Sequence, residues 1–159
     1  MPIPPPIDAI DRKIIRALQR NGRMTNLDLA AEVNLSPSPC LRRLRILEKS
    51  GVITGYSVAV DAQAYGLPMT VMVRISLEKH SEDIVSSFEA QMKAIPEILE
   101  CLVMTGQSDY LLRVVVRDLE DYERFVRKCL HPIGVISSID TSFVYGVVKC
   151  TYVYPEIRG

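Results

Sequence analysis

The stretch that decides the fold of the N-terminal part is residues 25–53, TNLDLAAEVNLSPSPCLRRLRILEKSGVI. Thr25 is followed three positions later by an acidic residue, a spacing that predicts a capped helix start. Asn34 tolerates the left-handed backbone of a tight turn, and Ser36-Pro37 supplies a cap and a first residue for a second helix. A short helix, a tight turn and a longer helix are typical of a helix-turn-helix, which reads the major groove of DNA.

Both helices of this motif are expected to have an apolar side and an exposed side. The expected buried residues are Leu27, Ala30 and Val33 in the first helix and Cys40, Leu44 and Leu47 in the second. The expected DNA-binding residues are Arg23, Thr25, Asn26, Ser36, Ser38, Pro39, Arg42, Arg43 and Arg45.

Within this set we expect Ser38 and Arg42 at base edges and Arg23 at the phosphate backbone. Arg43 lies between the buried and the exposed side, so a phosphate contact and an ion pair with Glu48 both fit its position. The alternative for the whole motif is an ordinary helical hairpin with a solvated basic face.

The formal net charge of zero hides two unlike halves. Residues 1–57 carry nine Lys and Arg against five Asp and Glu, a net of +4, and residues 58–159 carry ten against fourteen, a net of −4. A basic head suits contact with phosphates, and an acidic remainder does not. Because four positive charges are few, DNA binding is expected to need a dimer.

A further helix is expected to precede the motif and to complete a three-helix head. The prolines at positions 4–6 form a stiff arm that leads to Asp8, a helix cap. The apolar stripe of this helix consists of Ile7, Ile10, Ile14 and Leu18, and Ile15 beside it fits either the core or a dimer contact.

The segment after the motif is expected to separate two domains. Gly51 ends the second helix, residues 52–60 are expected to be extended as a wing or hinge, and residues 61–68 break the pattern with a glycine and a proline. We therefore expect a DNA-binding domain over 1–57, a hinge over 58–68 and a second domain over 69–159.

The second domain starts with a clean alternation of apolar and polar residues over 69–77, which predicts a strand with one buried face. A helix capped by Ser81, strands over 97–105 and 110–117, a helix capped by Asp118 and a strand over 135–149 are expected to follow. The inward residues of the helices are expected to be Ile84, Val85, Phe88 and Met92, and then Leu119, Tyr122, Val126 and Cys129. The order β-α-β-β-α-β predicts a ferredoxin-like domain, an antiparallel sheet with two helices on one face, and so an α+β protein.

The other face of that sheet is expected to be apolar and to need a cover. It would carry Leu102, Met104, Leu111, Val115, Val144 and Val148. Because water disfavours so much apolar area, a second subunit is expected to cover it, which predicts a homodimer.

The composition argues against several other classes of protein. The cysteines, Cys40, Cys101, Cys129 and Cys150, stand at unrelated spacings in apolar patterns and are expected to be reduced core residues. Cys129 and His131 are too few donors for a metal site, so no metal and no other cofactor is expected.

An enzyme site could be imagined at Asp109, Tyr110 and His131. The sequence, however, lacks a phosphate loop, a nucleophile beside a base and a carboxylate pair. We therefore expect no enzyme.

The hydropathy pattern predicts a cytoplasmic protein, and the predicted DNA binding would make it nucleoid-associated. No apolar run approaches the roughly 20 residues that span a bilayer, so no membrane partner is expected. The first residues also lack the charged and apolar regions of a signal peptide.

Several short motifs together resemble the leucine-responsive regulatory protein/asparagine-regulator (Lrp/AsnC) family of prokaryotic transcription factors over nearly the full length. In the head they are Ile10-Asp11-Arg12-Lys13-Ile14, Asn21-Gly22-Arg23, Leu35-Ser36-Pro37-Ser38-Pro39-Cys40-Leu41 with Arg43, Leu47-Glu48 and Gly51-x-Ile53. In the second domain the motif is Gly106-x-x-Asp109-Tyr110-Leu111-Leu112, which resembles the effector loop of the family.

The resemblance implies a regulator that binds double-stranded DNA at imperfect palindromes as a dimer. It also implies that residues 69–159 are a ligand-sensing and oligomerisation domain, with assembly to tetramers or octamers and a response to a free amino acid as effector. The residues implied at the effector are Thr105, Gly106, Gln107, Ser108, Asp109, Tyr110 and Thr141. The alternative function is an oligomeric amino-acid-sensing or interaction module without specific DNA binding.

The residues themselves also suit an effector loop. Free amides beside Gly106 fit a carboxylate, and Asp109 fits an α-ammonium group. The alternative is a plain hairpin turn in which Asp109 holds backbone amides. Gln107 stands where the family commonly carries an acidic residue, which favours an apolar or polar neutral amino acid over a basic one.

Overall fold

The computed structural model describes residues 7–157 and divides the chain into two compact units. The first unit comprises the described parts of Met1–Ala59 and Lys149–Gly159, and the second is Val60–Val148. The chain therefore passes between the units twice. This differs from the expected division, which placed everything after residue 69 in one domain. The expected arm at prolines 4–6 lies outside the described residues.

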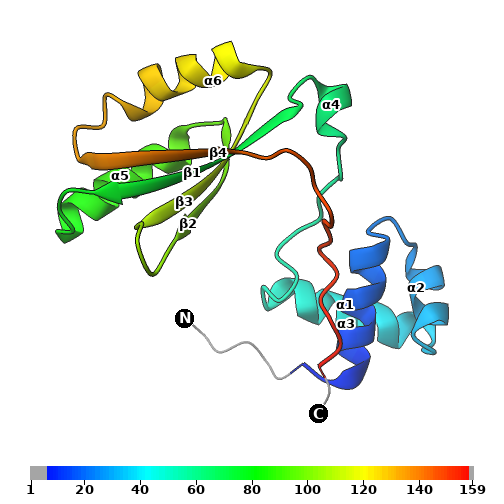
Figure 1. Cartoon of the computed structure of the whole chain (residues 1–159). Helices are drawn as coiled ribbons and strands as arrows, with labels where there is room; N and C mark the ends of the chain where they lie inside the picture. The colour runs from blue at the N-terminus through cyan, green and yellow to red at the C-terminus, as the bar shows by residue number, and fades with distance from the viewer. Residues whose placement is uncertain (1–6, 158–159) are drawn as a thin grey trace. The chain divides into compact units, whose positions relative to one another are not determined.

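The first unit, the head, contains three helices, α1 (Ala9–Arg20), α2 (Asn26–Glu32) and α3 (Pro37–Lys49) (Figure 1). Asp8 caps α1 as predicted, because its side chain accepts hydrogen bonds from the amides of Ile10 and Asp11, both at 2.8 Å. Thr25 caps α2 by accepting from the amide of Asp28 at 3.2 Å. Asn34 has the predicted left-handed backbone, with φ 56°.

The start of α3 differs from the expectation in one respect. Ser36 occupies the cap position, but its side chain makes no cap hydrogen bond. A cap side chain bonds the second or third amide of the helix, and Pro39 at the third position has none. Pro37 at the first position still starts the helix, because its backbone angle suits that position.

The core of the head lies where the three helices meet. Its buried side chains are Ile14, Ala17, Leu29, Ala30, Val33, Cys40 and Leu47, and Ile15 packs against them. The prediction of a buried Leu27 is wrong, since this side chain is 67% exposed and Leu29 is buried instead. Each residue of an α-helix turns the chain by about 100° around the helix axis. Leu27 and Leu29 are two residues apart, so they lie on nearly opposite sides of α2.

The segment between head and sheet forms one helical turn that the sequence analysis did not predict. Helix α4 (Ala62–Tyr65) starts at Asp61, whose side chain accepts from the amide of Ala64 at 2.6 Å, and it ends at Gly66 with φ 92°. The glycine is needed there because a left-handed residue closes the turn. Residues 52–60 contain no strand.

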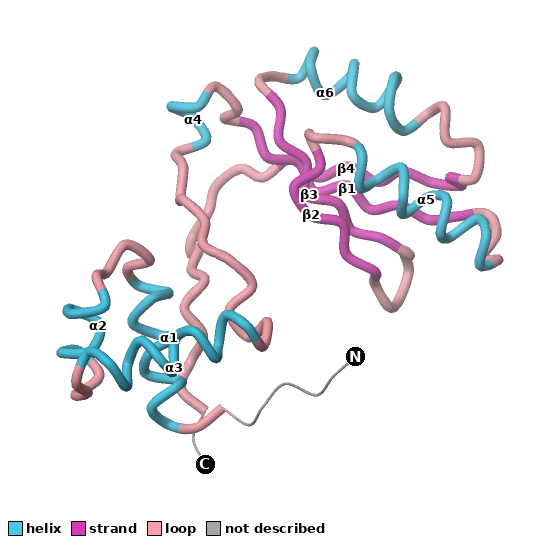
Figure 2. Tube along the Cα trace, turned by 180° about the vertical axis from the view of Figure 1, so that it is seen from behind, coloured by secondary structure: helices cyan, strands magenta, loops and turns pink. Residues whose placement is uncertain are grey.

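The second unit has the predicted β-α-β-β-α-β order. Its elements are β1 (Met69–Leu77), α5 (Glu82–Ala94), β2 (Ile98–Val103), β3 (Tyr110–Val116), α6 (Leu119–Phe125), a π-helical turn η1 (Val126–Leu130) and β4 (Ile136–Phe143). The strands lie in the order β2-β3-β1-β4, and all neighbours are antiparallel. Figure 2 shows α5 and α6 on the same side of the sheet. The predicted fold class is therefore confirmed.

The core of this unit lies between the sheet and its helices. Alternate residues of β1 are buried there as predicted, with Val71, Val73 and Ile75 fully enclosed. They pack with Phe88 and Met92 of α5, as expected, and with Tyr122 and Phe125 of α6.

Two predictions about this unit are wrong. Leu119 is 61% exposed, whereas Val126 and Cys129 are partly buried and pack against the core as expected, beside the buried Phe125 and Leu130. The π-helical turn adds a residue to the helical repeat, so Phe125 and Leu130, five positions apart, both face inward. The last strand also ends at Phe143, so Val148 lies outside the sheet.

Candidate functional site

One side of α3 presents the residues predicted to meet DNA. Ser38, Arg42 and Arg45 are exposed and line a shallow hollow with Leu41, Ile46 and Lys49. Their spacing of four and three residues places them on one stripe of the helix. Between residues 7 and 157, none of the three side chains has a hydrogen-bond or ion-pair partner. Their donors are therefore available to an external acceptor.

Arg43 lies next to these residues in the sequence but has a different environment. Its guanidinium donates to Asp8 and to Asp11 at the start of α1, each at 2.8 Å. These two hydrogen bonds raise the pKa of Arg43 above its ordinary value. The alternative of an ion pair with Glu48 is wrong, because Arg43 pairs with Asp8 and Asp11, and Glu48 accepts from the hydroxyl of Tyr56 at 2.8 Å. A phosphate contact by Arg43 stays a prediction.

The remaining DNA-binding candidates lie around the turn of the motif. Thr25 donates its hydroxyl to Asp28 at 2.6 Å, and the amide of Asn26 donates to the carbonyl of Pro37 at 2.9 Å. Asn26 therefore ties α2 to the start of α3. The other three are Arg23 and Ser36, which are exposed, and Pro39, which is half-buried. Their contact with DNA stays a prediction.

The predicted effector loop connects β2 to β3. Gly106 has φ 115°, a backbone conformation that favours glycine. Thr105 and Gln107 are exposed, and Ser108 is half-buried. Asp109 anchors the loop to the neighbouring strand, because its amide donates to the carbonyl of Ile75 at 2.9 Å.

The carboxylate of Asp109 already has two partners within the chain. One oxygen accepts from the amide of Leu77 at 2.7 Å, and the other lies 2.9 Å from Nε2 of His80. The Leu77 amide first, and then His80, lower the pKa of Asp109. The sequence analysis did not connect His80 with this site, since the two residues lie 29 positions apart and form no recognisable motif.

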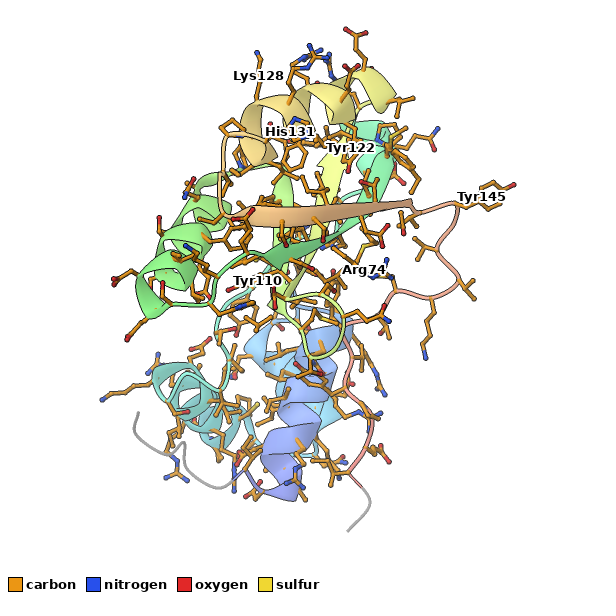
Figure 3. The ribbon with its side chains drawn as sticks, turned by 60° about the vertical axis from the view of Figure 1, so that its left-hand side comes forward. Arg74, Tyr110, Tyr122, Lys128, His131 and Tyr145 are labelled. Carbon is orange, nitrogen blue, oxygen red and sulfur yellow. The ribbon has the colours of Figure 1, made fainter. Side chains whose placement is uncertain are left out.

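The other two effector candidates face the helices. Tyr110 is buried, its hydroxyl donates to Glu89 of α5 at 3.2 Å, and burial together with Glu89 raises its pKa to about 12 (Figure 3). Thr141 of β4 shares a 2.6 Å hydrogen bond with the hydroxyl of Tyr122 on α6. Two strands separate β4 from β2, so the structure does not bring Thr141 to the loop within one chain.

The structure also describes the cysteines and the possible ligands of a metal. Burial raises the pKa of the thiols of Cys40, Cys101 and Cys129, whereas Cys150 is exposed, contrary to the expectation of a core residue. From residue 7 to 157, no three His, Cys, Asp or Glu side chains gather closely enough to hold a metal ion. In the same range no helix is both long and apolar enough to cross a membrane.

Comparisons with known proteins agree with both parts of this arrangement. Residues 7–54 match the winged helix-turn-helix DNA-binding family, and residues 70–154 match the Lrp/AsnC ligand binding domain. The leucine-responsive regulatory protein of Haemophilus influenzae is 39% identical over 145 residues, which cover 91% of this chain and 87% of that protein. The Bkd operon transcriptional regulator of Pseudomonas aeruginosa is 42% identical over 137 residues, covering 86% and 90%.

A solved structure extends the likeness to three dimensions. A transcriptional regulator from Neisseria meningitidis, crystallised as an L-Met complex, superposes with a TM-score of 0.89 at 35% identity, covering 94% of this chain and 97% of that one. The match to the ligand-binding family alone spans more than half of the chain. This protein therefore belongs to the Lrp/AsnC family of transcriptional regulators.

Proposed function

We propose that this regulator binds palindromic operators as a dimer through α3 and that a free amino acid, bound at subunit interfaces of the sheet unit, changes this binding. The observation that carries the proposal is the exposed stripe of Ser38, Arg42 and Arg45 on the second helix of the motif. Arginine donors on such a helix suit base edges and phosphates. The role is regulatory and not catalytic.

The amino-acid effector is proposed from the loop around Gly106 and from a relative. The related regulator from Neisseria meningitidis was solved as an L-Met complex. In this chain the loop offers a glycine with free space around it, and the carboxylate of Asp109 lies beside it. A zwitterion needs a donor for its carboxylate and an acceptor for its ammonium group; the loop amides beside Gly106 are the proposed donors, and the carboxylate of Asp109 is the proposed acceptor.

Assembly is proposed from the sheet face that α5 and α6 leave uncovered. Leu102 and Met104 are 47% and 40% exposed on this side. The same face carries ion pairs of Arg74, labelled in Figure 3, with Asp140 at 3.2 Å and of Arg113 with Glu100 at 3.0 Å. An apolar surface with charged pairs among its apolar residues suits a second copy of the chain, and dimers then assemble to tetramers or octamers.

Binding of the purified protein to the DNA upstream of its own gene tests this function. The affinity is measured over a range of salt concentrations and with each of the twenty amino acids. A steep salt dependence and a shift with a few amino acids are expected. Binding without any shift would remove the effector role, and no specific binding to this DNA or to genome-selected DNA would favour an assembly module without operator recognition.

A further inference from the structure

The last segment of the chain packs on the DNA-binding head and not on the sheet unit from which it emerges. Residues 149–157 belong to the same compact unit as α1, α2 and α3. Figure 1 shows this segment, coloured red, running beside the blue helix α1, and Figure 2 shows the same arrangement from behind. We name residues 151–157 the strap.

Gln19 on α1 holds the strap through its backbone. The Gln19 amide nitrogen donates to the carbonyl of Tyr152 at 2.7 Å, and its oxygen accepts from the amide of Tyr154 at 3.1 Å. A side-chain amide offers one donor and one acceptor side by side, which matches the carbonyl and amide of residues two apart in an extended chain. The rings of Tyr152 and Tyr154 are both 73% exposed, so the backbone makes the contact.

A second contact lies further along the strap. Glu156 forms an ion pair with Arg16, one turn before Gln19 on α1. Glu156 and Ile157 also line a groove with basic residues of α1, namely Arg12, Lys13, Arg16 and Arg20. The acidic side chain of the strap therefore lies among cations of the head, which favours docking.

The strap does not cover the DNA-reading stripe. The groove that receives it is lined by α1 and by Glu32 and Val33 of α2, whereas the stripe lies on α3, and the two share no residue. A docked strap therefore leaves Ser38, Arg42 and Arg45 open to DNA. The strap therefore does not compete with an operator for these three residues.

The strap does provide a second connection between the two units. Residues 54–60, which form the first connection, are all exposed and contain neither helix nor strand. When the strap is docked, the chain leaves and re-enters the head at two fixed places. The head can then adopt fewer orientations than it can when the strap is undocked. Restricting a binding element before it binds lowers the entropy lost on binding.

We propose that the strap, by docking on α1, pre-orients the head and thereby raises the affinity of the dimer for its operator. This inference rests on the proposed operator binding. Two hydrogen bonds and one ion pair hold the strap, so docking is an equilibrium that changes in the sheet unit can shift, because residues 144–150 join the strap to β4.

Three uncharged substitutions test the proposal. Gln19→Leu removes both hydrogen bonds, and Tyr154→Pro removes the amide that donates to Gln19. Tyr154→Ser is the matched control, because it also removes the exposed ring but keeps that amide. Docking is measured in each protein as the rate at which trypsin cuts after Lys149, since a protease needs several extended residues on both sides of the bond.

The same proteins are then tested for binding to a duplex that the wild type selects from random-sequence DNA. Gln19→Leu and Tyr154→Pro are expected to be cut about ten-fold faster or more, since cleavage follows the undocked population. They are expected to bind the duplex about three- to ten-fold more weakly with an unchanged salt slope, because no phosphate contact is lost. Tyr154→Ser is expected to match the wild type in both measurements.

Several results would overturn the proposal. Cleavage as slow as in the wild type would show that Gln19 does not hold the strap, and faster cleavage with equal or tighter DNA binding would deny the pre-orienting role. A shallower salt slope would point to a direct phosphate contact. Wild-type cleavage that slows with rising protein concentration would show docking between copies.

If the wild type selected no sequence at all, the proposed function itself would fail, whereas failure of the strap alone leaves wild-type binding intact.

Discussion

Arg43 of α3 donates a 2.8 Å hydrogen bond to Asp11 of α1, and this contact joins the DNA-reading helix to the helix behind it. The neighbouring Arg42 and Arg45 have exposed side chains on the same helix. Three arginines within four positions therefore divide into one that holds the head together and two that are free to meet DNA. Sequence spacing alone places all three in a single basic cluster.

Substitution of these arginines should separate stability from DNA binding. Arg43→Met is expected to lower the melting temperature of the head by several degrees, because it leaves Asp8 and Asp11 without their cation. Arg42→Met is expected to leave the melting temperature unchanged and to reduce the salt slope of operator binding by about one. Circular dichroism and fluorescence anisotropy measure the two effects. An equal loss of salt slope in both variants would assign Arg43 to the phosphates as well.

The stability of the head should depend on pH through Asp8. The amide of Asp11 first, with Arg43 as a further cause, lowers the pKa of Asp8 in the folded chain. A lowered folded pKa contributes stability above the ordinary pKa of the carboxyl, and this contribution is lost as the pH falls through the folded value. Thermal unfolding of the head should therefore shift to lower temperature in acid, and Asp8→Asn should flatten this shift. An unchanged pH profile in Asp8→Asn would contradict the assignment.

The caps and the alternating strand could be predicted from the sequence because they depend on residues a few positions apart. Asp8 and Thr25 cap their helices as predicted, and β1 buries alternate residues. The partners of Arg43 lie 32 and 35 positions away, and the Gln19–Tyr152 contact spans 133 positions. Such contacts depend on how the elements pack, so no local pattern indicates them. The same holds for Leu119, whose exposure follows the packing of α6.

The candidate site could be predicted only as a set of residue types. The exposed stripe of α3 follows from helical periodicity, and the turn at Gly106 follows from its glycine. The partner of Asp109 is His80, which comes from the segment after β1, and Thr141 lies on the opposite edge strand from β2. Which residues meet at a loop depends on strand order, and strand order does not follow from spacing.

Each unit has its own core and is expected to unfold separately. Ile14 is fully buried in the head, and Phe88 is fully buried beneath the sheet. Ile14→Ala should destabilise the head by about 2–5 kcal/mol, and Phe88→Ala should destabilise the sheet unit by about 3–5 kcal/mol. Hydrogen exchange resolved by peptide reports both units at once. Equal loss of protection in both units with either variant would show that they unfold together.

The hydrogen bond between Tyr122 and Thr141 gives a test of Thr141 that separates structure from effector binding. Thr141→Val keeps the shape of the side chain but removes the 2.6 Å contact, and it should cost about 0.5–1.5 kcal/mol. Thr141→Ser keeps the hydroxyl and serves as the control. If Thr141 only supports α6, both variants should retain effector affinity once folded. Loss of effector affinity in Thr141→Val with normal folding would place Thr141 at the ligand.

Asp109 gives the sharpest test of the effector loop, because its carboxylate is shared between the fold and the proposed ligand. Asp109→Asn keeps an oxygen for the amide of Leu77 but removes the charge, so the loop should remain folded. The affinity for the effector amino acid should fall by about ten-fold or more, because the α-ammonium group loses its anionic partner. DNA binding without effector should not change. Asp83→Asn, at an exposed position on α5, controls for the loss of one negative charge.

His80→Ala completes the argument about Asp109. The oxygen of Asp109 that lies 2.9 Å from His80 is the one not used by the backbone, so an ammonium group has to share or displace this contact. Removal of the imidazole should therefore strengthen effector binding by about two- to five-fold, as expected when one competing contact to a carboxylate is lost. Isothermal titration with the amino acid found in the screen measures both variants. Weaker effector binding in His80→Ala would show that His80 contacts the ligand. Unchanged effector binding in Asp109→Asn would show that the effector binds outside this loop.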